Sequence, residues 1–496
     1  TAESWAWVNA RKTELDGEEE DGEGGGSPAK IRDFPFAVLF VAQLVAMIVV
    51  GGYFGSWGSS TSSQPTHYDD DELEQAMEKM EETVADVEAH SLRILSYLVI
   101  PCGAIAFLMT YVGTAVVIPS FSELAVGACL AASVVLPALL VLLSLLSGAV
   151  GAAIPFGIIL AITIWYVRRI WPMVPFAAAN LTAALKGMSS NWGVYLIAVM
   201  FSVLSAVWVV FWSYAANGIF AREAAGENGE SHDGVFWLTM FLLLVSLYWT
   251  TTVMLNTIQT SVAGVIGTWC FNKTLASGCC SLAVTSSLYR SLTYSFGSIC
   301  LGSLFEALIR ALRVLSDMAR DDDGCSSEGR ILVCILQCIL SCFESMIEYF
   351  NQWAYVFVGV YGYGYVESGK KVMELFKARG FTAIITNDLV GYVLRFTAMV
   401  VAILTGLMGV ALEAWTKTYS AAGGSFLFGQ VEGAGVWAFF VAFLVGLFVS
   451  SVMTNAIVGA VNAIIVCYAD APGKLEENHR ELTHRMATAW VSAFPE

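Results

Sequence analysis

Long apolar runs separated by short polar segments are the main pattern along this chain of 496 residues. Many runs are uncharged over about 20 positions, the length that a helix needs to cross the hydrocarbon core of a bilayer. The pattern predicts an all-α, polytopic integral membrane bundle of about ten transmembrane helices, with room for one or two more or fewer in 257–380. The expected spans are 34–54, 92–112, 124–146, 149–167, 194–216, 235–256, 292–314, 331–349, an aromatic segment at 353–366, 389–412 and 436–468.

Polar tracts divide the chain further. We expect an acidic, Gly-rich N-terminal tail at 1–33, the first transmembrane helix at 34–54 and an acidic extramembrane loop at 55–91. The main transmembrane bundle then covers 92–468, and a C-terminal tail covers 469–496. Gly-rich, like-charged tracts bury too little apolar surface to fold by themselves, so both acidic tracts are predicted to be solvated.

Composition agrees with a lipid environment. Hydrophobic residues make up 57% of the chain and charged residues 14%, against about 25% charged residues in ordinary soluble domains. The net charge of -17 argues against a nucleic-acid partner, because phosphate binding needs clustered Lys and Arg. Membrane lipid is the expected surrounding, and other membrane proteins are possible partners.

Short basic loops set the predicted orientation. Arg168, Arg169 and Lys186 follow the fourth span, and Arg480 and Arg485 lie in the C-terminal tail. Because Lys and Arg are enriched on the cytoplasmic side, we expect both termini to be cytoplasmic, in the plasma membrane or an organelle membrane.

The sequence lacks the common enzyme and metal motifs. It has no GxxxxGK[ST], HExxH or GxSxG pattern and no CxxC pair, so we expect no enzymatic activity, no cofactor and no metal site. Every His lies outside the apolar spans, which excludes a membrane-embedded His relay. Cys334, Cys338 and Cys342 repeat every four residues and are predicted to pack helix against helix.

Charged residues interrupt the seventh and eighth expected spans. Glu306, Arg310 and Arg313 are spaced i, i+4 and i+7, and Glu344 and Glu348 are four apart. One interpretation is a structural i,i+4 ion pair at a cytoplasmic rim. The other is gating or charge compensation, because ionisable groups at membrane depth usually face a bundle interior or a wet cavity.

A third acid stands at the start of a later expected span. Asp388 follows Asn387, which is predicted to cap that helix. Since no His is available, proton coupling would have to use carboxylates. The candidates for proton or charge coupling are therefore Glu306, Glu344 and Asp388.

The stretch "NQWAYVFVGVYGYGYVESGKK", 351–371, combines a membrane-like composition with Trp353, Tyr355, Tyr361 and interspersed glycines. Aromatic faces bind quaternary ammonium groups, and glycines let the backbone break where it lines a cavity. We therefore predict substrate-binding roles for these three aromatic residues. An interfacial aromatic belt is the alternative.

The sixth expected span offers a second candidate surface. Trp249, Thr252, Asn256 and Gln259 recur at helical spacing and present one face. The first three are predicted to bind an ammonium group and a small hydroxyl. Hydrogen bonding between helices is the alternative explanation.

Three blocks of sequence stand out by their polar and aromatic residues. They are "CSLAVTSSLYRSLTYSFGSICLGSL" at 280–304, "NQWAYVFVGVYGYGYVESGKKVMELFKARGFTAIITNDLVG" at 351–391 and "VCYADAPGKLEENH" at 466–479. Together they resemble the choline transporter-like family, nearest to its fungal and protist branch. The resemblance extends over essentially the whole membrane portion. It implies an integral membrane protein that carries choline, or in some cases ethanolamine, by facilitated diffusion or proton-coupled exchange.

Two classes of function follow from these observations. The first is a secondary transporter of choline or a related small organic cation, which the resemblance and the aromatic chemistry both favour. The second is a non-transporting structural or accessory subunit of a larger membrane complex, which the long solvated tracts would suit.

Overall fold

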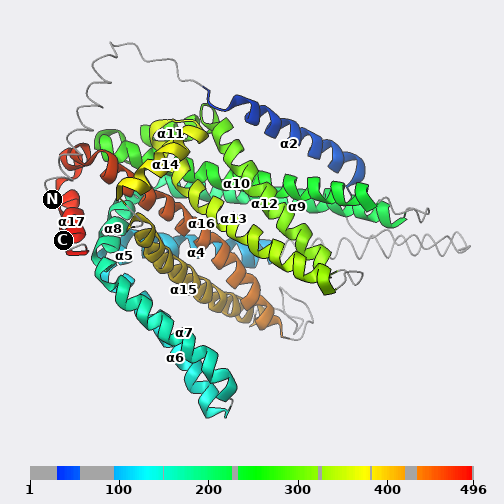
Figure 1. The fold of residues 1–496 in the computed structure, drawn as a ribbon, viewed down its shortest axis with the longest axis horizontal. Helices are drawn as coiled ribbons and strands as arrows, with labels where there is room; N and C mark the ends of the chain where they lie inside the picture. The colour runs from blue at the N-terminus through cyan, green and yellow to red at the C-terminus, as the bar shows by residue number, and fades with distance from the viewer. Residues whose placement is uncertain are drawn as a thin grey trace, which may run out of the picture. The chain divides into compact units, whose positions relative to one another are not determined.

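The computed structural model describes residues 31–55, 94–148, 150–225, 233–321, 327–379, 382–418 and 433–493. Within these ranges every regular element is a helix and there is no strand (Figure 1). The all-α prediction is therefore confirmed. Residues 1–30 and 56–91, which hold most of the predicted acidic tail and loop, lie outside the described residues.

Eight helices in the described part of the chain are long and apolar enough to cross a membrane, which confirms a polytopic integral membrane protein. These spans are Phe34–Phe54, Ser96–Ser120, Ser122–Leu146, Ala153–Ser190, Gly193–Phe220, Trp237–Phe271, Leu389–Lys417 and Ala434–Asp470.

Helices α12 (Phe296–Asp321) and α13 (Ser327–Tyr361) have 26 and 35 residues and lie side by side (Figure 1). Both are long enough to span a bilayer, although neither belongs to the apolar set of eight. The sequence placed separate spans at 331–349 and 353–366, and this was wrong. No Pro or Gly interrupts the junction, so α13 continues through it.

The remaining helices complete the fold in chain order. They are α2 (Phe34–Phe54), η1 (Leu95–Val99), α4 (Ile100–Val112), η2 (Gly113–Val117), α5 (Ile118–Ser120), α6 (Ser122–Leu146), α7 (Val150–Ile170), η3 (Trp171–Met173), α8 (Val174–Ser190), α9 (Gly193–Ala225), α10 (Asp233–Phe271), η4 (Lys273–Leu275), α11 (Leu282–Leu292), α14 (Tyr365–Arg379), α15 (Thr382–Thr418), α16 (Ala434–Asp470) and α17 (Pro472–Ala493).

The chain forms two compact units. The smaller unit contains residues 59–121 and 391–455. In it, α15 and α16 approach closely through small residues: a Cβ on Gly409 would lie 2.4 Å from the Cβ of Ala442. Ala442 also packs in a buried cluster with Leu98 and Cys102. Small residues allow such close approach in lipid, where packing replaces the hydrophobic effect between helices.

The larger unit contains residues 1–58, 122–390 and 456–496, and α10 packs there against α9, α11, α12 and α13. Glycines bring α10 and α13 into backbone contact. A Cβ on Gly359 would lie 2.3 Å from the carbonyl oxygen of Thr260 and 3.1 Å from the amide nitrogen of Gly264. Any larger residue at this position would push the two helices apart.

The backbone breaks at the end of α13, as the glycine-rich sequence predicted. Gly362 has a φ of 74°, in the left-handed region that glycine adopts without strain. Helix α14 starts at Tyr365, whose backbone N–H donates to Asp33 Oδ2 at 3.0 Å. The same oxygen accepts a hydrogen bond from the Ser298 hydroxyl at 2.6 Å. Asp33 thus connects the start of α2 to α12 and α14.

The predicted C-terminal tail is mostly the helix α17, which packs on α8 and α10. The His479 ring stacks on Trp269 with a centroid distance of 3.8 Å, and His479 Nε2 lies 2.9 Å from the Trp269 carbonyl oxygen. Asn478 Nδ2 donates to the Phe271 carbonyl oxygen at 3.0 Å. These contacts cover the C-terminal end of α10.

Candidate functional site

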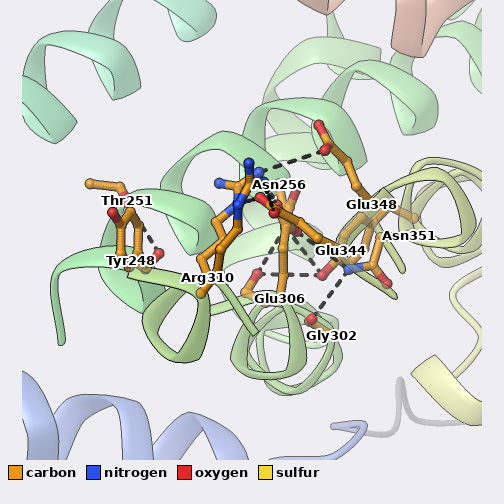
Figure 2. A network of polar contacts seen from close by, with 12 residues as sticks. Tyr248, Thr251, Asn256, Gly302, Glu306, Arg310, Glu344, Glu348 and Asn351 are labelled. Carbon is orange, nitrogen blue, oxygen red and sulfur yellow. Dashed lines mark hydrogen bonds and ion pairs between the residues drawn. The ribbon is translucent and has the colours of Figure 1, made fainter. Parts of the chain in front are cut away.

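Polar side chains of α10, α12 and α13 meet in a buried hydrogen-bonded network (Figure 2). Asn256 Nδ2 donates to Ser303 Oγ at 2.9 Å and to the Tyr355 hydroxyl oxygen at 3.2 Å. The Tyr355 hydroxyl donates to the Ile299 carbonyl oxygen at 3.3 Å. Buried polar groups cost free energy unless they are paired, so these bonds fix the three helices relative to one another.

The network continues toward the start of α14. Asn351 Nδ2 donates to the Gly302 carbonyl oxygen at 3.2 Å and lies 3.4 Å from Glu306 Oε2. The Tyr365 hydroxyl donates to Asn351 Oδ1 at 2.6 Å. A Cβ on Gly302 would lie 2.5 Å from the Tyr355 hydroxyl oxygen. Glycine at 302 is therefore required for both tyrosines to reach the network.

An ionic cluster borders the network on α12 and α13. Arg310 lies 2.7 Å from Glu306 Oε1, 3.3 Å from Glu344 Oε1 and 3.8 Å from Glu348 Oε2. Figure 2 shows the three carboxylates turned toward Arg310. Their side chains are 6%, 16% and 50% exposed in that order. The cluster thus leads from a buried carboxylate to a half-exposed one.

The predicted i,i+4 pair of Glu306 and Arg310 is confirmed, as is the shared face of Glu344 and Glu348. The low exposure of Glu306 does not fit a solvent-exposed rim. Glu306 belongs to the buried network instead, so charge compensation describes its surroundings better than a surface ion pair does.

The face predicted on α10 is buried. Trp249 Nε1 donates to the Cys300 carbonyl oxygen at 2.9 Å, and its ring meets Phe40 edge to face at 5.3 Å. Thr252 is 2% exposed, and its hydroxyl has no hydrogen-bond partner. The fourth residue of this face, Gln259, lies beside Gly459 of α16.

Two of the three predicted aromatic residues on α13 are in the core. Trp353 and Tyr355 are both 0% exposed, which excludes the aromatic-belt explanation for them, because a belt residue faces lipid headgroups. Tyr361 instead stacks with Phe357 and Tyr363 at the end of α13. The structure thus brings Asn256 and Tyr355 into the network beside Glu306, while Trp249 contacts Cys300 further along α12. It leaves Tyr361 apart, about 9 Å further along the helix axis from Tyr355.

The predicted cap at Asn387 is wrong. Helix α15 starts at Thr382, so Asn387 lies inside the helix rather than before it. The uninterrupted apolar run begins only at Leu389, after Thr386, Asn387 and Asp388, and for this reason the sequence placed the start too late. The side chain of Asp388 lies outside what the structure describes.

Several residues of the network were missed from the sequence, chiefly Asn351, Ser303 and Tyr365. A signal for the first existed. Glu344, Glu348, Asn351 and Tyr355 are spaced i, i+4, i+7 and i+11, so they share a face of one continuous helix. The predicted helix boundary at 349 concealed this spacing.

The cysteine prediction fails for the three residues of α13. Cys334, Cys338 and Cys342 are exposed on the helix surface, whereas Cys102 and Cys300 are buried between helices. Among the described residues, no group of three or more His, Cys, Asp or Glu side chains could hold a metal ion.

Many apolar helices around a buried polar and ionic network define a polytopic integral membrane protein. The family model described as plasma-membrane choline transporter matches residues 154–472. The chain therefore belongs to the choline transporter-like family, as its sequence blocks predicted.

Fungal relatives are similar over about two thirds of this chain. Protein PNS1 of Neurospora crassa is 32% identical over 347 residues, which cover 68% of this chain and 60% of the relative. Protein PNS1 of Gibberella zeae is 29% identical over 345 residues, 68% of this chain and 61% of the relative. Protein PNS1 of Yarrowia lipolytica is 26% identical over 360 residues, which cover 70% of this chain and 62% of the relative. The matched region thus spans less than two thirds of each of these three relatives.

Proposed function

We propose that the protein is a secondary transporter that carries choline or a related small organic cation by facilitated diffusion or exchange with protons. The observation that carries the proposal is the Glu306 carboxylate, 6% exposed at the junction of the central helices. A buried carboxylate attracts a cation strongly, because the surroundings screen the charge less than water does. Neither covalent chemistry nor a cofactor is needed for this role.

The groups around Glu306 suit an amino alcohol. Asn256, Ser303 and Tyr355 form one hydrogen-bonded group next to Glu306, and can bind a small hydroxyl. Trp249 and Trp353 lie on the two helices that carry Asn256 and Tyr355. A quaternary ammonium group has no N–H to donate, and aromatic faces stabilise it through cation–π contacts.

Both tryptophan rings are covered in this conformation, with exposures of 3% and 0%. A cation therefore reaches them only after α10, α12 and α13 separate. Rearrangement of helices around a central site is the general mode of action of secondary transporters. In this proposal both termini face the cytoplasm.

The test is uptake of radiolabelled choline and ethanolamine by proteoliposomes that contain the purified chain, with and without a pH gradient. We expect saturable uptake by the wild type and loss of uptake in Trp249→Ala and Trp353→Ala. Trp437→Ala is the matched control, because Trp437 is 56% exposed on α16. Equal loss in all three variants would show a general effect of removing an indole.

The second candidate is the structural or accessory subunit. The burial of Trp249 and Trp353 favours this second function, because a purely structural core consists of closely packed side chains. Absence of uptake and of binding for both amines, by wild-type protein with a cooperative thermal transition, would support this second function and overturn the first.

A further inference from the structure

Arg310 occupies the position where the counter-ion of Glu306 must lie. Its guanidinium is 2.7 Å from Glu306 and also contacts two carboxylates one turn apart on α13, Glu344 and Glu348. A planar guanidinium with five donors can hold several carboxylates at once. Arg310 is therefore a cation that the protein itself supplies to the buried acid.

The contacts on α13 give this cation a second position. Glu344 and Glu348 lie toward the exposed end of the cluster, at 16% and 50% exposure. If Arg310 leaves Glu306, its charge stays compensated by these two acids. Only Glu306 then lacks a counter-ion, and a buried carboxylate without one is costly.

Arg313 provides a comparison on the same helix. Its Nη1 lies 2.5 Å from Glu344 Oε2, and its side chain is 44% exposed. Both arginines pair with Glu344, but Arg310 alone of the two also pairs with Glu306. The two arginines therefore carry the same charge, yet only Arg310 neutralises the buried acid.

We infer that Arg310 is a built-in competitor of the transported cation for Glu306. When a small organic cation binds at Glu306, the guanidinium moves to Glu344 and Glu348, and it returns when the cation leaves. The site is then never left with an uncompensated buried charge, with or without substrate. This inference rests on the proposed function and adds to it the residue that controls affinity and release.

The unpaired hydroxyl of Thr252 supports an incoming ligand independently of the charges. It lies on α10 one turn before Asn256, is 2% exposed and has no hydrogen-bond partner. A buried hydroxyl without a partner calls for an explanation, and a bound polar group is one of those available. The hydroxyl of an amino alcohol would satisfy it.

The experiment is equilibrium binding of radiolabelled choline to the purified full chain in nanodiscs at about pH 8, where carboxylates are ionised at their ordinary pKa. If Arg310 competes, Arg310→Gln should tighten binding about tenfold or more, and should slow choline exchange. Arg313→Gln leaves Glu306 and Arg310 paired, and should therefore change choline affinity clearly less than Arg310→Gln does.

Equal affinities of Arg310→Gln and the wild type, or weaker binding by folded Arg310→Gln, would overturn the inference. If Arg310→Gln does not fold, the double variant Glu306→Gln with Arg310→Gln removes both charges and restores neutrality. It should lose choline binding, and wild-type affinity in this variant would equally refute competition at Glu306. Failure of the wild type to bind either amine would instead refute the proposed function.

Discussion

The Oδ2 atom of Asp33 accepts a hydrogen bond from the backbone N–H of Tyr365 at 3.0 Å, between residues 332 positions apart. The carboxylate lies at the N-terminal end of α14, where unpaired N–H groups and the helix dipole favour a negative charge. One acidic residue before the first span thus holds the break that ends α13.

Replacement of Asp33 by Ala should destabilise the larger unit. It removes the acceptor for both Tyr365 N–H and Ser298 Oγ, and we expect a loss of about 1–2 kcal/mol. Thermal unfolding in detergent measures the effect. Arg32→Ala is the control, because its ion pair with Glu367 is 3.8 Å long and its side chain is 40% exposed. Equal losses in the two variants would contradict the role of Asp33.

The glycine contact between α10 and α13 should be intolerant of a methyl group. Gly359→Ala would place Cβ 2.3 Å from the Thr260 carbonyl oxygen, and we expect destabilisation of about 1–3 kcal/mol from overpacking. Gly157→Ala on α7 meets no atom within 4 Å and should be neutral or stabilising. A comparison of their unfolding temperatures tests the prediction, and a neutral Gly359→Ala would refute it.

The position of each acid along the ionic cluster predicts its contribution to stability. Glu306→Gln leaves Arg310 without its buried partner and should cost roughly 2 kcal/mol or more. Glu348 is 50% exposed and lies 3.8 Å from Arg310. Glu348→Gln should therefore reduce the free energy of unfolding by only about 0–1 kcal/mol. Chemical denaturation of both variants distinguishes them. The reverse order would mean that Glu306 is not the buried end of the cluster.

The contact of α17 with α10 should weaken in acid. Burial lowers the pKa of His479 below its ordinary 6.5, and nearby Lys273 and Lys186 add to the effect, against the opposing hydrogen bond to Trp269. The stabilisation is therefore fully present above about pH 6.5 and is lost as pH falls through the lowered pKa, because the unfolded state then binds the proton more readily.

Hydrogen–deuterium exchange over α17 at several pH values measures this loss. Exchange at acidic pH, corrected for its intrinsic rate, should rise in the wild type and change less in His479→Gln. His484→Gln, at an exposed position of the same helix, is the control and should behave as the wild type does. A pH response that survives in His479→Gln would assign the effect to other groups.

Labelling of the exposed cysteines of α13 can test whether this side of the helix faces lipid. Large apolar side chains such as Ile335, Ile339 and Phe343 are exposed beside them. Thiols react as thiolates, which form in water and not in hydrocarbon. A membrane-impermeant maleimide should therefore label Cys280 in open membranes, but not Cys334. Equal labelling of the two would place this face of α13 in water.

Local spacing predicted local contacts well. The Glu306 and Arg310 pair follows from i,i+4 geometry alone, because both residues lie on one helix. The contact of Asn256 with Tyr355 joins residues 99 apart, and a sequence pattern gives each helix face but not which faces meet. Candidate residues were therefore identified on the right helices, while their partners Ser303 and Asn351 were not.

The predicted helix boundaries were wrong where the composition changes along a helix that continues without a break. The change from charged to aromatic lettering near 349 indicated two segments, although no helix-breaking residue lies there. Because the predicted boundary at 349 fell between Glu348 and Asn351, the sequence did not show that these two residues share one face of a continuous helix. Asn387 shows the converse error, because the polar residues Thr386, Asn387 and Asp388 interrupt the apolar residues of α15 and resemble a loop.

Helix α13 carries the ionic cluster near its middle and Trp353 close to its C-terminal end without a break. With 35 residues it is about 50 Å long, and a regular helix resists bending over such a length. Any tilt that follows a change of charge at Glu344 must therefore displace Trp353 as well. Rigid-body movement of α13 would thus link the charge state of the ionic cluster to the position of Trp353 in the aromatic core.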